Sequence, residues 1–372
     1  QVTVECDSTG NMQHAVNIVG MASNSVKESK DRVFAAVRNS GMSYHTGRYT
    51  INLAPADLKK ESSSLDLPIA IALLIHNGFV RQIPLTRIAI IGELSLDGNV
   101  RPVNGVLPIA IAAKRDDIDI LIVPRENAEE AAIIDDLKVI PVTSLAEAAA
   151  YLNGENTIPQ TVVDREKIFQ VLNDFPLDMH DVKGQYQVKR ALEVAAAGGH
   201  NLLMIGPPGS GKTMLARRVP TILPELTLDE ALEATKIHSV AGFSKDFKNG
   251  ILTTRAFRAP HHTISDVALI GGGAFPKPGE VSLSHRGVLF LDELPEFKHG
   301  VLEVLRQPLE DGFVTISRVQ ASLSFPAMFI LVSAENPCPC GFYGENDGVH
   351  QCTCRLGDIE RYHKKISGPL LD

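Results

Sequence analysis

The sequence predicts a two-domain α/β protein, and three observations lead to that prediction. Residues 1–152 alternate strand-like β-branched runs with helix-period stretches, which is typical of a mixed α/β domain. Residues 177–372 contain a glycine-rich loop between a strand and a helix, and a second apolar strand that ends in two carboxylates. Residues 153–176 combine scattered charges with glycine and proline, and we interpret them as a linker.

The elements of the first domain follow from its apolar runs. Each expected strand is a short aliphatic or β-branched run, and each expected helix repeats apolar residues at a period of about 3.6. In chain order we expect a helix over 25–39, a strand over 49–53, a helix over 68–77, a strand over 88–91, a helix over 108–115, a strand over 120–123 and a helix over 128–135.

Residues 206–213 have the spacing of a phosphate-binding loop. A strand-like run at 201–205 precedes them and a helix-like stretch at 214–219 follows, which is the context that this loop requires. Lys212 would reach the β- and γ-phosphates of ATP, and the Thr213 hydroxyl would hold Mg²⁺. The alternative is a glycine-rich turn before an ordinary helix. The predicted nucleotide-binding residues are Gly206, Pro207, Pro208, Gly209, Ser210, Gly211, Lys212 and Thr213.

Two later strand ends supply further candidate catalytic residues. The apolar run 288–291 ends at Asp292 and Glu293. Asp292 would complete the Mg²⁺ shell and Glu293 would polarise the attacking water, although a strand followed by a solvated acidic turn is the alternative. After another buried strand at 328–332, Asn336 would lie beside the γ-phosphate and orient that water. An asparagine at a strand end is, by itself, more often a turn residue.

The rest of the second domain is expected to be helical with two insertions. A helix is predicted over 187–197, another over 228–240 after a Thr227–Glu230 capping box, and a third over 301–307. Residues 251–284 are too rich in glycine and proline for a plain helix, and we expect an inserted loop or hairpin that projects from the core. A second hairpin is predicted from strands at 313–317 and 321–325, with Arg318 and Gln320 at its tip.

Basic residues and histidines on these insertions carry weaker predictions. Arg255, Arg258, Lys277 and Arg318 are candidate DNA contacts, and ordinary solvated charge is the competing interpretation. His261 and His262 are adjacent, so their side chains are expected to point apart, and we assign them to a structured loop rather than to a metal site.

Four of the five cysteines fall between positions 338 and 354. Such crowding favours metal ligation over a disulfide framework, and four thiolates are enough for a closed tetrahedral Zn²⁺ site. His350 or His363 could replace one thiol, and four reduced cysteines in a loop are the alternative. The candidate zinc ligands are Cys338, Cys340, Cys352 and Cys354.

The overall composition limits the class of protein. Hydrophobic residues make up 44% and charged residues 22%, as in an ordinary globular protein, and the net charge of -8 argues against a wholly basic nucleic-acid coat. No apolar run approaches the roughly 20 residues that a membrane span needs, and no leader is visible, so we expect a cytoplasmic protein. The chain starts at Gln1 and stops at Asp372 in mid-motif, so we expect a fragment of a longer chain.

The first domain resembles the proteolytic domain of Lon-type proteases. The resemblance lies in NLAPADLKKE at 52–61, LPIA at 67–70, GELSLDG at 92–98 and LIVPREN at 121–127. It places Ser64 at or next to the position of the serine nucleophile, but Leu107 stands where the family has its lysine base. Because a serine without a base is a weak nucleophile, we expect a non-proteolytic relative.

The second domain resembles the AAA+ ATPases, an αβα sandwich, and more narrowly their magnesium-chelatase-like branch. That similarity lies in APHHTIS at 259–265, GVLFLDEL at 287–294, RQPLEDG at 306–312 and NPCPCG at 336–341. The whole chain is similar to the ComM/YifB-type family. The resemblance implies a cytoplasmic, hexameric ring that uses ATP and Mg²⁺ to drive branch migration of DNA during natural transformation.

Other functions remain open for this sequence. The same fold serves ATPases that remodel a protein partner, and modules that use ATP only to switch their assembly state. The resemblance also implies an arginine beyond Asp372 that completes a neighbouring active site. We therefore hypothesise that this fragment binds nucleotide but hydrolyses it slowly, since such an arginine contributes roughly 10³-fold or more to the rate.

Overall fold

The computed structural model divides by internal contacts into two compact units. The N-terminal unit comprises Gln1–Glu166 together with Ser244–Ile251, and the C-terminal unit comprises Lys167–Phe243 and Leu252–Asp372. The structure describes residues 1–10, 15–56, 60, 62–82, 84–164, 177–243, 247, 250–273, 276–318, 321–345 and 350–371. Positions 165–176 of the expected linker, with Gln320, lie outside those ranges.

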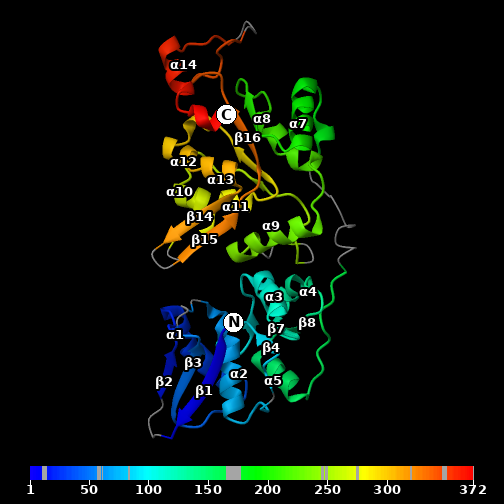
Figure 1. The fold of residues 1–372 in the computed structure, drawn as a ribbon, viewed down its shortest axis with the longest axis vertical. Coiled ribbons are helices and arrows are strands. Elements are labelled where there is room, and N and C mark those ends of the chain that lie inside the picture. Colours follow the sequence, from blue (N-terminus) through cyan, green and yellow to red (C-terminus); the bar gives the residue numbers. More distant parts are fainter. Residues whose placement is uncertain are drawn as a thin grey trace. The chain divides into compact units, whose positions relative to one another are not determined.

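The described part of the N-terminal unit has two three-stranded sheets with helices beside them, and one two-stranded sheet (Figure 1). In the first sheet the central strand β3 pairs antiparallel with β1 and parallel with β2. Its alternate residues Tyr49, Ile51 and Leu53 are completely buried, which is the period-2 pattern of a strand with one face in the core. The elements are β1 (Thr3–Thr9), β2 (Ala15–Val19), α1 (Asn24–Asn39), β3 (Arg48–Ala54) and α2 (Asp66–His76).

The second sheet of this unit is parallel, in the order β4-β7-β8. Leu121, Ile122 and Val123 of β7 are all completely buried, as expected of a central parallel strand covered on both faces. The seven elements predicted for residues 1–152 are confirmed, with ends shifted by a few residues. The remaining elements are β4 (Ile88–Ile90), the β5 (Glu93–Leu94) and β6 (Val100–Arg101) pair, α3 (Val106–Arg115), β7 (Ile120–Pro124), α4 (Ala128–Ala132), β8 (Lys138–Val142) and α5 (Leu145–Asn153).

The C-terminal unit is built on a parallel sheet of order β10-β13-β16-β9. All four residues of β13, Val-Leu-Phe-Leu, are buried, because the sheet is packed on both faces. Parallel strands present their carboxyl ends at one edge of a sheet, which is where ligands bind in this architecture. The strands are β9 (Leu202–Ile205), β10 (Phe257–Arg258), β13 (Val288–Leu291) and β16 (Ile330–Glu335).

Helices surround this sheet (Figure 1). The Thr227–Glu230 capping box at the start of α9 is confirmed: the Glu230 N–H donates to Thr227 Oγ1, and the Thr227 N–H donates to Glu230 Oε2. The expected single helix over 301–307 is two short helices. The helices are α7 (Tyr186–Gly198), α8 (Lys212–Ala216), α9 (Leu228–Ala241), α10 (Asp266–Ile270), α11 (Glu280–Leu283), α12 (His299–Glu303), α13 (Arg306–Asp311), α14 (Leu356–His363) and α15 (Gly368–Leu371).

The insertion at 251–284 differs from its prediction. It contains a short hairpin, β11 (Gly271–Gly272) with β12 (Lys277–Pro278), but it also supplies the edge strand β10 to the main sheet. Leu269 and Val281 from this segment are completely buried in the core. The expectation that the whole segment projects is therefore wrong, because its apolar residues are used for packing. The second hairpin is confirmed as β14 (Phe313–Arg318) with β15 (Ala321–Pro326).

Candidate active site

The loop 206–213 connects the carboxyl end of β9 to α8. Gly209 and Gly211 have φ of 79° and 89°, in the left-handed region that a residue with a Cβ rarely adopts. Those two positions therefore require glycine for the chain to turn from the strand into the helix. Lys212 and Thr213 are the first two residues of α8, so the fold carries both side chains to the strand-end edge of the sheet.

The Lys212 ammonium lies inside the turn of this loop. Its Nζ donates to the carbonyl oxygens of Gly206 at 2.6 Å and Pro207 at 3.0 Å. It also lies 3.3 Å from Oδ1 of Asn336, which follows β16 directly. Burial lowers the pKa of Lys212, while the nearby carboxylates of Asp292 and Glu293 act in the opposite direction. The structure thus brings Lys212 and Asn336 together from positions far apart in the sequence.

Thr213, at the start of α8 after β9, meets Asp292, which follows β13. Thr213 Oγ1 donates to Asp292 Oδ2 at 2.6 Å. A hydroxyl and a carboxylate oxygen are hard oxygen ligands of the kind that Mg²⁺ prefers when it also binds phosphate. The donor set therefore fits the Mg²⁺ ion that the sequence predicts here.

Glu293 occupies an unusual backbone conformation beside these groups. Its φ is 53°, and its side chain is 51% exposed. A residue with a side chain pays conformational energy in this region, and such residues gather at functional sites. The Glu293 N–H donates to Asp292 Oδ1 at 3.0 Å, which fixes the Asp292 carboxylate at the end of β13.

His262 is a site residue that sequence reasoning missed. The prediction that its side chain points away from that of His261 is wrong, because the two ring centroids lie 4.0 Å apart. The Nδ1 of His262 lies 3.3 Å from Oε2 of Glu293. The contact follows from the strand register. Phe257 of β10 pairs with Val288 of β13, and His262 and Glu293 each lie five positions further along their own strand's chain. Because a two-residue edge strand gives almost no periodicity in a sequence, no local signal could have found this contact.

Two of the four candidate DNA contacts have partners within the protein. Arg255 donates to the carbonyl oxygens of Pro224 and Arg286 at 2.6 Å each. Arg258 makes a bidentate pair with Glu280 at 2.6 and 2.7 Å. Both guanidinium groups are thus engaged within the protein, which favours a structural role over the predicted DNA contact. Lys277 is exposed, and the side chain of Arg318 lies outside the described part of the chain.

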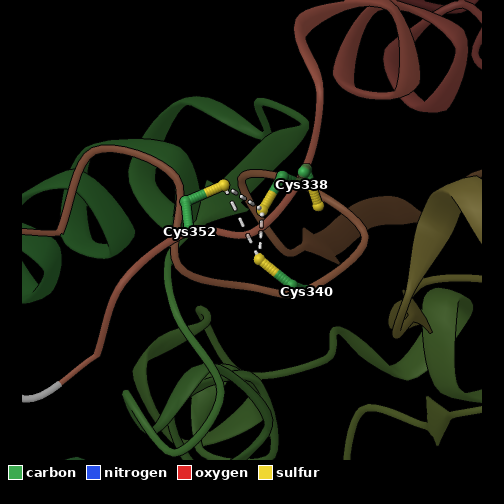
Figure 2. Close-up of side chains that lie close together, drawn as sticks. Cys338, Cys340 and Cys352 are labelled. Atoms are coloured by element: carbon green, nitrogen blue, oxygen red, sulfur yellow. Dashed lines mark hydrogen bonds between the residues drawn. The ribbon is translucent and has the colours of Figure 1, made fainter.

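The four clustered cysteines come together as a candidate metal site. Their sulfurs all lie within 4.8 Å of one another, and Cys338 is buried. Cys338 Sγ lies 3.3 Å from Cys340 Sγ and 3.7 Å from Cys352 Sγ, and the sulfurs of Cys340 and Cys352 are also 3.7 Å apart (Figure 2). A tetrahedral Zn²⁺ with bonds of about 2.3 Å holds its sulfurs about 3.8 Å apart. The observed spacing therefore fits the coordination sphere of zinc.

The protonation of these thiols also depends on their crowding. Backbone N–H groups of Phe342 and Thr353 lower the pKa of Cys340 to about 6. The pKa of Cys354 is raised to about 12 despite a backbone N–H from Cys340, because burial and the neighbouring sulfurs oppose a further negative charge. A divalent cation would remove that repulsion. The cluster found among the described residues contains neither His350 nor His363.

Ser64 and Leu107 lie in the N-terminal unit. Ser64 is 9% exposed on η1 (Ser63–Leu65). Leu107 on α3 is completely buried, and its N–H donates to Glu130 Oε1 at 2.9 Å. The position where the Lon-type resemblance would put a lysine is thus packed into an apolar core.

Among the described residues, no helix combines the length and the apolar character that a membrane crossing requires.

Comparison with known proteins gives matches along nearly the whole chain. The family model "Magnesium chelatase, subunit ChlI" matches residues 178–372, and "Subunit ChlI of Mg-chelatase" matches residues 4–127. The chain is 44% identical to Competence protein ComM of Haemophilus influenzae over 372 residues, all of this chain and 72% of that protein. It is 43% identical to YifB of Escherichia coli over 357 residues, 96% of this chain and 68% of YifB.

The chain is also similar, at lower identity, to a subunit named for magnesium chelatase. The Magnesium-chelatase 38 kDa subunit of Rhodobacter capsulatus is 26% identical over 175 residues, which is 42% of this chain and 49% of that subunit.

Proposed function

The chain belongs to the ComM/YifB-type magnesium-chelatase-like family, and from that membership and the site geometry we propose that it binds and hydrolyses ATP with Mg²⁺. The observation that carries the proposal is the meeting of three strand ends: Lys212 beside Asn336, and Thr213 beside Asp292. A glycine-rich turn without a ligand would give no reason for these polar groups to converge.

Each residue has a defined role in this proposal. The loop 206–213 and the Lys212 ammonium bind the phosphates, while Thr213 and Asp292 hold Mg²⁺, which neutralises phosphate charge when bound. Glu293 accepts a proton from the attacking water, and Asn336 orients that water. The partial exposure of Glu293 leaves its carboxylate accessible to solvent, as a base that acts on water requires.

We further propose that the protein works as a cytoplasmic, hexameric DNA motor that drives branch migration during natural transformation. This role is supported by the name of the Haemophilus influenzae relative, a competence protein, and by the resemblance to ring-forming AAA+ ATPases. The N-terminal unit is proposed to be a non-proteolytic Lon-like domain, because Leu107 replaces the base. The proposal includes Zn²⁺ as a structural ion in the cysteine cluster.

A second candidate is an ATPase that remodels a protein partner. The observation in its favour is the similarity to the Rhodobacter capsulatus magnesium-chelatase subunit. A nucleotide-dependent assembly switch would use the same site without turnover.

Steady-state ATP hydrolysis by the full-length protein, with forked DNA, single-stranded DNA or duplex, tests the proposal. We expect forked DNA to stimulate hydrolysis most strongly. Glu293→Gln is the matched variant: it should still bind ATP, while hydrolysis falls by about 10²-fold or more through loss of the general base. Stimulation by a protein partner and not by DNA would favour remodelling, and ATP binding without turnover would favour the switch.

A further inference from the structure

The segment that carries the first two cysteines touches the candidate ATP site at both of its ends. Asn336, two positions before Cys338, lies 3.3 Å from the Lys212 ammonium. Gly341, directly after Cys340, packs against the phosphate-binding loop. A Cβ built on Gly341 would lie 2.6 Å from Cδ and 2.7 Å from Cγ of Pro208, so the Gly341 backbone and the Pro208 ring are in close contact.

This contact depends on the conformation of the cysteine-bearing turn. Gly341 has a φ of 90°, and its N–H donates to the Cys338 carbonyl oxygen at 2.9 Å. The Phe342 N–H donates to Cys340 Sγ, as does the Thr353 N–H from the second pair of cysteines. Backbone N–H bonds to sulfur are the outer-shell contacts that orient metal thiolates. The turn that meets Pro208 is thus the same turn that aims the sulfurs.

The second cysteine pair meets the first through sulfur contacts, backbone groups and one aromatic pair. Cys352 and Cys354 come from a separate stretch, and in the described part of the chain sulfur contacts and the Thr353 and Cys340 N–H groups join the two stretches. The rings of Phe342 and His350 also stack, with centroids 4.6 Å apart. A closed four-thiolate zinc site contributes folding free energy directly, because its ligands are ordered only when the metal is bound.

We propose that Cys338, Cys340, Cys352 and Cys354 bind one Zn²⁺ and that this ion holds Asn336 and Gly341 against the phosphate-binding loop, so that ATP affinity depends on zinc. The inference rests on the proposed ATP site and adds a metal dependence to it. The zinc takes no part in hydrolysis and acts on the position of Pro208 and of the Lys212–Asn336 pair.

The first measurement is the metal content of the purified chain by mass spectrometry, with equilibrium ATP binding before and after zinc removal. We expect one zinc per chain, its loss in Cys352→Ser and its retention in Cys6→Ser, which changes a cysteine outside the cluster. ATP should bind at least about fivefold more weakly after zinc removal, the lower end of typical coupling between two sites. Circular dichroism checks that the rest of the chain stays folded.

A matched glycine pair separates positioning from general destabilisation. Gly341→Ala and Gly344→Ala both place a Cβ at positive φ, 90° and 84°, but Gly344 has open space around it. We expect both variants to keep one zinc, and only Gly341→Ala to weaken ATP binding, by at least about fivefold, because only its Cβ pushes Pro208 away.

The possible results distinguish a failure of the zinc dependence from a failure of the proposed ATP site. A chain without zinc, equal ATP affinity with and without zinc, or equal ATP affinity in the two glycine variants would overturn the inference while the ATP site stands. A chain that holds zinc but binds no ATP contradicts the proposed function itself, and the metal dependence with it.

Discussion

The Glu293 carboxylate lies beside His262, which belongs neither to the phosphate-binding loop nor to β13. Of the described contacts of this carboxylate, the one to His262 Nδ1 at 3.3 Å fixes the direction in which the proposed base points. His262 is therefore a positioning residue, acting on water only through Glu293.

His262→Ala tests that role. Because a general base contributes about 10²–10⁴-fold to a rate and His262 only orients that base, we expect kcat for ATP to fall at least about tenfold, with KM little changed. His262→Asn should recover part of the rate, because its amide nitrogen can reach the position of Nδ1. Steady-state kinetics on the full-length protein give the answer, and an alanine variant with wild-type kcat would refute the role.

Glu335 is a buried acid immediately before Asn336. It is 3% exposed, and its Oε2 has no hydrogen-bond partner among the described residues. Burial raises the pKa of Glu335, and His363, whose Nδ1 lies 3.6 Å from Oε1, acts in the opposite direction. A raised pKa means that the folded state holds this proton more tightly than the unfolded state does. The resulting stability is present below the ordinary pKa of 4.5 and is lost as pH rises through the folded pKa.

Glu335→Gln removes this pH dependence. We expect the variant to unfold at a higher urea concentration than the wild type at neutral pH, and the difference to disappear below the ordinary glutamate pKa of 4.5. Glu360→Gln, with a side chain that is 72% exposed, is the control. Equal shifts in the two variants would contradict the burial argument.

The site residues that the sequence predicted belong to local patterns. Lys212 and Thr213 follow from one eight-residue loop, and the observed Thr213–Asp292 contact agrees with the roles proposed for both, which still await a functional test. His262 could not be predicted, because its position beside Glu293 depends on how β10 pairs with β13.

The insertion shows why whole elements are harder to predict than single motifs. Its glycines and prolines correctly excluded a long helix, and β11 with β12 forms a short hairpin. The prediction that it projects was wrong because burial of Leu269 and Val281 depends on long-range packing that composition does not reveal.

Arg258 and Glu280 tie the edge strand β10 to α11 within this insertion. Their bidentate pair is partly buried, with side chains 26% and 22% exposed. Because the loss of Arg258 would leave Glu280 without its partner, we expect Arg258→Ala to lower the free energy of unfolding by about 1–2 kcal/mol. The exposed Lys277→Ala should change it by less than about 0.5 kcal/mol. Urea unfolding measures both, and indistinguishable curves would show that Arg258 is not structural.

The N-terminal unit as a whole is expected to lack peptidase activity. Ser64 is nearly buried, and Leu107 lies completely inside the core where the Lon-type pattern has a lysine. We expect no cleavage of casein or of fluorogenic peptides with or without ATP, and Ser64→Ala to leave ATP hydrolysis unchanged. Cleavage that Ser64→Ala abolishes would contradict this interpretation.

The molecule as a whole is an α/β chain whose C-terminal unit gathers three strand ends around Lys212. The alternation of strands and helices and the order of the strand-end motifs were predictable, because each depends on residues close together in the sequence. The cysteine spacing indicated metal ligation. The contact between Gly341 and Pro208, however, depends on the folded path of residues 336–341, and no pattern in the sequence predicted it.

Equilibrium binding of ATP, measured with and without Mg²⁺, tests most directly whether Lys212 and its neighbours form a nucleotide site. We predict that the wild type binds ATP more tightly with Mg²⁺, that Lys212→Ala loses most of this affinity, and that Asp292→Asn retains ATP but loses the effect of Mg²⁺. Equal ATP affinity in the wild type and Lys212→Ala, or no ATP binding by either, would contradict a nucleotide site around Lys212.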